Sequence, residues 1–145
     1  MKKNISILSL VMILFACDEY MEIQYSKVIN YYVFNSATDV PALIKTEEMF
    51  NDYFGAAAFM GKNGMPTPID FSKEVVIAVV LPETNFPTTI EPIRLTKKDK
   101  RLVLYYSVKE DLPVSFTMRP MLLIKTSAKK AEKVKLVREK KVENE

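Results

Sequence analysis

Histidine is absent from this chain of 145 residues, and the single cysteine is Cys17. Without histidine the chain cannot form a Ser-His-Asp or Cys-His catalytic site, use an imidazole as acid or base, or ligate haem through histidine. Zinc sites built from cysteine and histidine are excluded with it. A lone cysteine also excludes an intramolecular disulfide. Carboxylate chemistry remains open, either in a metal site or in a pair of acids for hydrolysis.

Glycine is scarce, and neither positive nor negative charge is in large excess. The three glycines leave no glycine-rich loop for phosphate groups. Once a leader with Lys2 and Lys3 is removed, 19 of the 21 basic residues face 18 acidic ones. This balance gives no support to nucleic-acid binding. We therefore expect no cofactor, no metal and no nucleic-acid partner, and 48% apolar residues are ordinary for one globular domain.

The N-terminus has the pattern of a secretion signal. Lys2 and Lys3 precede an apolar run over residues 5–15, which is too short to span a bilayer comfortably. Leu14-Phe15-Ala16-Cys17 follows at once. A small residue before the cysteine admits the signal peptidase, and the thiol accepts a diacylglyceryl group. The segment resembles the lipobox of bacterial lipoproteins. The alternatives are a short N-terminal anchor or a buried first helix.

The lipobox resemblance implies a membrane anchor at Cys17. Residues 1–16 would be removed, and the two or three fatty chains of such lipoproteins, palmitate among them, hold a protein stably where one chain does not. Asp18-Glu19 resembles the acidic signal by which lipoproteins of Bacteroidota reach the cell surface, although the pair would serve equally as solvated tether residues. We expect an outer-membrane lipoprotein, on the periplasmic face or at the cell surface, with no spanning segment.

The remainder of the chain predicts an α+β domain, mainly antiparallel β-sheet (sandwich or partial barrel) with one packed helix. Residues 75–81 are apolar throughout and predict a central strand covered on both faces. Residues 46–55 predict a helix with Thr46 as its N-cap and Gly55 as its left-handed end. Its Met and aromatic stripe should face the core.

We expect further strands along the chain, and we expect the chain to consist of four segments. The strands lie at residues 28–34, 40–45, 88–95, 101–108, 114–126 and 134–137. The strand at 114–126 should present one apolar face, made of Val114, Phe116, Met118, Leu122 and Ile124. We expect a signal peptide at 1–16, the lipidated cysteine and a spacer at 17–27, one β-rich domain at 28–138 and a charged tail at 139–145.

A family resemblance spans residues 40–137. The stretch from Asp70 to Glu74, the apolar strand after it and Pro87-Thr88-Thr89-Ile90-Glu91-Pro92-Ile93 resemble the protease-complex-subunit (PrcB-like) family. Residues 44–50 fit that family's entry from strand to helix. The family's Pro-Thr-Gly-Gly-Tyr-like turn is replaced here by Pro87-Thr88-Thr89. The resemblance implies a small envelope domain that accompanies a secreted protease or another envelope partner.

Three functions fit these features. The first is a non-enzymatic protein-binding domain on a lipid anchor, whose contact surface would be one loop made of Asn85, Phe86, Pro87, Thr88 and Thr89. That loop, with Arg119-Pro120, is also similar to the loops of chagasin-type protease inhibitors. The second function is accordingly that of a protease inhibitor, or of a lipoprotein that protects its cell from a toxin or protease. The third is a hydrolase using two carboxylates, either Asp70 with Glu74 or Glu91 with Asp111. We expect the non-enzymatic function.

Overall fold

The computed structural model describes residues 19–57 and 63–140. These residues form two four-stranded sheets, with strand orders β1-β7-β8-β10 and β2-β9-β6-β4, and a separate β3-β5 pair. The elements are β1 (Met21–Ile23), β2 (Ser26–Val28), β3 (Tyr31–Val33), β4 (Leu43–Ile44), α1 (Glu47–Tyr53), β5 (Phe54–Ala56), β6 (Val75–Val80), β7 (Thr88–Lys98), β8 (Arg101–Glu110), β9 (Met121–Thr126) and β10 (Lys133–Arg138).

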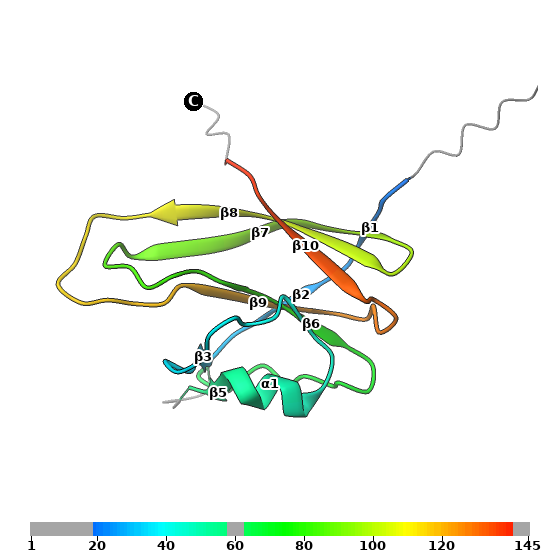
Figure 1. Ribbon diagram of the computed structural model, residues 1–145, viewed down its shortest axis with the longest axis horizontal. Helices are drawn as coiled ribbons and strands as arrows, with labels where there is room; N and C mark the ends of the chain where they lie inside the picture. Colours follow the sequence, from blue (N-terminus) through cyan, green and yellow to red (C-terminus); the bar gives the residue numbers. More distant parts are fainter. Residues whose placement is uncertain (1–18, 58–62, 141–145) are drawn as a thin grey trace, which may run out of the picture.

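The two sheets stack face to face and enclose the first core (Figure 1). Side chains of β6 and β9 meet those of β7 and β8 there, and the buried members are Ile77, Val79, Ile90, Leu95, Leu102, Leu104, Tyr106, Leu122 and Ile124 together with Ala128 and Ala131. The sequence prediction of a β-sandwich is confirmed.

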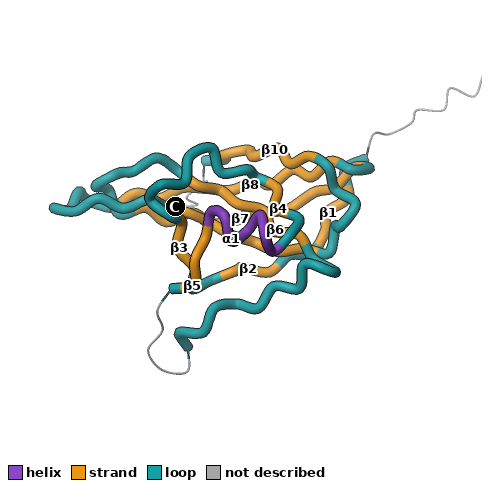
Figure 2. The backbone as a smooth tube through the Cα atoms, turned by 60° about the horizontal axis from the view of Figure 1, so that its bottom comes forward, coloured by secondary structure: helices purple, strands orange, loops and turns teal. Residues whose placement is uncertain are grey.

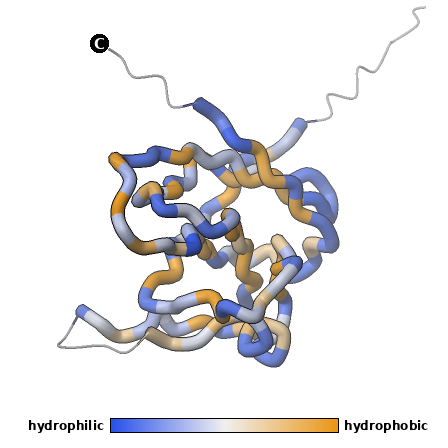
Figure 3. Tube along the Cα trace, turned by 60° about the vertical axis from the view of Figure 1, so that its left-hand side comes forward, coloured by the Kyte–Doolittle hydropathy of each residue, from blue (hydrophilic) through white to orange (hydrophobic). Residues whose placement is uncertain are grey.

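The opposite face of the β2-β9-β6-β4 sheet is covered by α1 and the β3-β5 pair (Figure 2). Successive β6 residues point alternately to the two sides, so Val76 and Ala78 belong to this second core and Ile77 and Val79 to the first. Burial on both sides explains why β6 has no polar face. The central strand and its two covers were correctly predicted. Figure 3 shows hydrophobic and hydrophilic stretches alternating along the described chain.

Helix α1 begins as predicted but ends differently. Thr46 is the N-cap, and its hydroxyl accepts the backbone N–H of Met49 at 3.2 Å. Phe50 and Phe54 are buried in the second core. The helix ends at Tyr53, and Gly55 is not a left-handed cap but lies in the extended strand β5, paired with Tyr32. The prediction for Gly55 was therefore wrong, because β5 continues directly from the helix to pair with β3.

Gly55 instead lies in close contact with the far end of a tyrosine side chain. A Cβ atom there would lie 2.8 Å from the Cζ and hydroxyl oxygen of Tyr32, whose side chain makes an edge contact with Phe34. Gly55→Ala should therefore displace the Tyr32 ring and cost about 0.5–1.5 kcal/mol in free energy of unfolding, the value of such an aromatic contact. Urea denaturation measures this cost. In a Tyr32→Ala background the same change should be neutral or slightly stabilising, because alanine suits a strand better than glycine. An undiminished cost in that background would contradict the steric explanation.

The spacer predicted for residues 17–27 is largely part of the domain. β1 pairs antiparallel with β7, Met21 opposite Lys97, and β2 pairs antiparallel with β9, Ser26 opposite Lys125. The chain crosses from one sheet to the other between them, where the Thr126 hydroxyl donates to the Gln24 carbonyl at 2.7 Å. Since these strands are short and largely polar, their pairing depends on distant partners that local patterning does not reveal.

The predicted strand at 114–126 forms only in its second half, as β9. Residues 111–120 form a long connection, and the Phe116 side chain is 60% exposed rather than in the core. Leu122 and Ile124 do face the first core as expected. Leu123, which lies between them, is buried as well, in the second core, because β9 lies beside β6 in the middle of its sheet.

The C-terminal strand β10 pairs parallel with β8, although an antiparallel arrangement dominates the fold. The predicted tail at 139–145 is fixed at its first residue. The Glu139 backbone N–H donates to the Tyr106 carbonyl at 2.8 Å, and its carboxylate accepts both Arg94 guanidinium nitrogens, at 2.7 and 3.4 Å. All buried core residues lie between residues 28 and 131. A chain that begins at residue 19 therefore keeps the complete core and both N-terminal strands.

Candidate functional site

Two connections form one end of the sandwich, and we call them the loop end: residues 81–87 between β6 and β7, and residues 111–120 between β8 and β9 (Figure 1, left). Backbone hydrogen bonds join them. The Val114 N–H donates to the Asn85 carbonyl and the Asp111 N–H to that of Pro87, both at 2.8 Å. Thr84 and Met118 form a β-bridge with reciprocal bonds of 2.9 and 2.8 Å. The two loops therefore form one fastened unit.

The predicted contact residues lie at this end, and Phe86 is fixed in a tight turn. Its backbone N–H donates to the Thr84 hydroxyl at 3.1 Å, and the Thr88 hydroxyl donates to the Phe86 carbonyl at 2.7 Å. The Phe86 side chain is 41% exposed. Asn85 and Thr89 are exposed, Pro87 and Thr88 are half-buried, and the two threonines begin β7. The loop is thus a rigid support that presents one aromatic ring to solvent.

Two further apolar residues at the loop end were missed by the sequence analysis. Leu112 is 85% exposed, and Phe116 is 60% exposed. The alternation over 114–126 predicts a core position for Phe116, and Leu112 falls between two predicted strands. The available signal was Leu112 itself, an apolar residue between Asp111 and Pro113 in a charged turn. With Phe86, these residues place three exposed hydrophobic side chains on two joined loops.

The immediate surroundings of these side chains are polar and mildly acidic. Near the loops there are three acidic residues, Glu83, Glu110 and Asp111, and two basic ones, Lys109 and Arg138. A groove of about 240 Å³ runs beside them, with Glu83, Glu110, Thr88 and Arg138 in its wall. Apolar side chains within a polar rim are typical of protein contact surfaces.

Arg119-Pro120 does not join the exposed loop surface. The Arg119 guanidinium donates to the carbonyls of Phe34 and Ala37 at 3.2 and 2.6 Å, and Pro120 is buried. Arg119 therefore fixes the turn after β3 to the main sheet. The two segments that are similar to chagasin-type loops do not form one exposed surface.

Three of the four carboxylates proposed for hydrolysis are engaged by neighbouring groups, and the fourth, Asp111, is exposed. Asp70 accepts hydrogen bonds from the hydroxyl and the backbone N–H of Ser72, and these bonds lower the pKa of Asp70 from its ordinary value, opposite to the change that a general acid requires. Glu74 is 3.3 Å from the Lys125 ammonium, and Glu91 forms an ion pair with Lys27 at 2.6 Å. Asp70 is thus a residue of the turn before β6.

The comparisons with known proteins are brief. No family model, no curated protein and no solved structure matches the chain. Within residues 19–57 and 63–140 no group of three or more potential ligand residues could hold a metal ion. The same residues include no helix that is both long and apolar enough to cross a bilayer. Cys17, the predicted lipidation site, lies outside the described residues.

Proposed function

We propose that this protein is a lipid-anchored envelope protein whose loop end binds a protein partner without catalysing a reaction. The observation that carries the proposal is the exposure of Phe86, Leu112 and Phe116 on two loops that backbone hydrogen bonds hold together. Exposed aromatic and aliphatic side chains on a preorganised backbone lose little entropy on binding. They are therefore suited to act as anchors in a partner's pocket.

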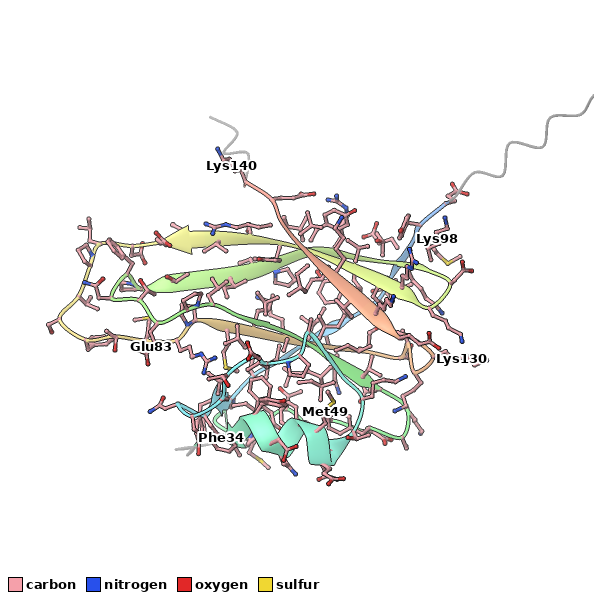
Figure 4. The ribbon with its side chains drawn as sticks, viewed as in Figure 1. Phe34, Met49, Glu83, Lys98, Lys130 and Lys140 are labelled. Carbon is pink, nitrogen blue, oxygen red and sulfur yellow. The ribbon has the colours of Figure 1, made fainter. Side chains whose placement is uncertain are left out.

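The position of the loop end supports this function. The described chain enters the fold at the opposite end of the sandwich, where β1 lies beside the β7-β8 hairpin (Figure 1). Glu83 and Lys98 mark the two ends in Figure 4. If Cys17 carries lipid, the loop end therefore projects away from the anchored side, towards other envelope or external proteins.

The class of partner follows from the sequence resemblance. Residues 70–93 resemble the PrcB-like family, which implies a secreted protease or another envelope protein as partner. A role in protection against a toxin or a protease would use the same surface, and only the identity of the bound protein separates these roles. The lipobox pattern that ends at Cys17 supports the outer-membrane anchor.

Photo-crosslinking in living cells tests the binding surface. A photoreactive amino acid is placed at Leu112 or at Phe116 in the full chain, and Met65, which is 64% exposed, is the matched control position. Both loop positions should give an adduct with the same protein, and Met65 should not. Phe86→Ala should lower the yield of that adduct severalfold.

Two results would overturn the proposal. Equal adducts from Met65 and from the loop positions would show that the loop end is not a specific surface. Mass spectrometry tests the anchor separately, because the N-terminal peptide of the purified protein should begin at Cys17 and carry a diacylglyceryl group. An unmodified cysteine would refute the lipid anchor and leave the binding surface to be judged by the crosslinks.

A further inference from the structure

The end of the sandwich opposite the loop end is strongly basic. We call it the basic end: residues 97–101 of the β7-β8 hairpin and residues 129–135 around the turn before β10. It holds eight basic and two acidic residues, and counting Glu19 and Glu22 of the neighbouring N-terminal segment still leaves an excess of four positive charges. The remainder of the described chain has nine basic and eleven acidic residues. The charge of this nearly neutral protein is therefore polarised along its length.

The basic end is a built surface and not a set of loose tails. The Lys100 carbonyl accepts the backbone N–H groups of Glu132 and Lys133 at 2.8 and 3.3 Å, and the Lys100 ammonium pairs with the Glu132 carboxylate at 2.9 Å. Parallel pairing of β10 with β8 then sets Lys133 beside Arg101. A groove of about 490 Å³ between the two turns has Lys98, Arg101 and Lys133 in its wall.

Several of these cations are available for an outside partner. Arg101, Lys130 and Lys133 are exposed and form no ion pair with any other described residue. Exposed apolar groups lie beside them: Tyr20 is 45% exposed, with the Lys98 ammonium 5.6 Å from its ring centroid, and Met21 is 70% exposed. Tyrosine next to lysine and arginine is the composition that proteins present to the headgroup region of a bilayer.

The anchor site is very close to this surface. Cys17 precedes Glu19 by two residues, a chain length of at most about 7 Å, and β1 begins at Met21. The 17–27 spacer expected from sequence would have let the domain move freely. With β1 and β2 inside the fold, only residues 18–20 separate the cysteine from the first strand. A lipid on Cys17 would therefore hold the basic end close to the membrane.

We propose that the basic end docks on anionic lipid headgroups, so that the domain stands on the membrane in a fixed orientation with the loop end outermost. The inference rests on the proposed lipid anchor for its biological setting, but the surface itself does not need the lipid. Phosphate-bearing headgroups complement clustered lysine and arginine, and each basic residue near such a surface strengthens binding about fivefold. The interaction supplies a second membrane signal besides the acyl chains.

Vesicle cosedimentation tests the surface without any anchor. The chain from residue 19 to the C-terminus, which retains the complete core, is mixed with vesicles of phosphatidylcholine that contain phosphatidylglycerol, or of phosphatidylcholine alone. It should bind only the anionic vesicles, and less as salt is raised. The triple variant Arg101→Gln, Lys130→Gln, Lys133→Gln should bind roughly a hundredfold more weakly, at about fivefold for each residue.

A matched variant controls for net charge. Lys109→Gln, Arg138→Gln, Lys140→Gln removes the same three charges from exposed positions outside the basic end. It should bind nearly as well as the parent chain, and both variants should show the parent's cooperative unfolding. Equal losses in the two variants would reduce the effect to overall charge, and binding to neither vesicle would overturn the proposal outright.

The lipidated protein, purified from its envelope, gives the second arm. In anionic proteoliposomes an amine-reactive reagent should modify Lys130 and Lys133 severalfold more slowly than in zwitterionic ones, while Lys109 and Lys140 react alike in both. Equal reaction at all four would refute the docked orientation even when the anchor is present. An unmodified Cys17 with intact vesicle binding would refute only the anchor, so the two failures are distinguishable.

Discussion

Ile77→Asp should leave the protein without a cooperative unfolding transition. Ile77 has no exposed surface and lies in the first core, with Ile124 of β9 on one side and Leu43 of β4 on the other. A buried carboxylate with no partner costs about 3–5 kcal/mol or more. The packing of the isoleucine is lost as well, at about 2–5 kcal/mol. The combined cost is comparable to the roughly 5–15 kcal/mol by which a whole domain is stable, so most of the native population should be lost. Val76→Asp should do the same through the second core.

Circular dichroism during thermal unfolding measures this effect. Ile93→Asp introduces the same charge on β7, where the side chain is 40% exposed, and should cost about 1 kcal/mol or less. A normal transition in the Ile77→Asp protein would show that β6 is not the strand shared by the two cores.

Phe54→Ala should have the second largest effect, a loss of about 3–5 kcal/mol in free energy of unfolding. The Phe54 ring is 2% exposed and lies 5.1 Å from that of Phe50, which in turn contacts the rings of Tyr31 and Phe71. Removing the ring opens a cavity among the neighbouring rings, which α1, β3 and the loop that carries Phe71 cannot readily fill. Urea denaturation with a constant m-value would record the loss as a lower midpoint.

The chain provides its own control for this truncation. Phe116→Ala deletes the same group at a position that is 60% exposed, and it should change stability by about 0.5 kcal/mol or less. A large loss at Phe116 would return that residue to the core and remove it from the loop end. A small loss at Phe54 would show that the helical layer contributes little to the fold.

Much of the fold could be predicted because its signals are local. An unbroken apolar run can only be a strand with two covers, and this gave β6 its place between two cores. Thr46 followed by two acidic residues marked the start of α1. The predicted strand at 101–108 formed as β8, whose Leu102, Leu104 and Tyr106 lie in the first core. Each of these patterns is contained in a dozen residues or fewer.

The rest depended on partners distant in sequence. The sequence predicts a spacer where β1 and β2 form, because three-residue polar strands have no recognisable pattern without their partners β7 and β9. Phe116 follows the alternation of a strand, yet residues 111–120 leave the sheet and pair with the 81–87 connection only through the Thr84–Met118 bridge and single hydrogen bonds. The loop end was consequently found in part: Phe86 was predicted, and Leu112 and Phe116 required the structure.

The pairing of the first strands with late ones also sets an order on folding. Met21 has its partner at Lys97 and Ser26 at Lys125, so neither ladder can close until most of the chain has been made. Closing such long loops costs conformational entropy before any contact compensates for it. Folding is therefore slow. Under the export that we propose, a chain that closes these ladders late would stay unfolded long enough to pass through a secretion channel, and its two sheets would assemble on the far side.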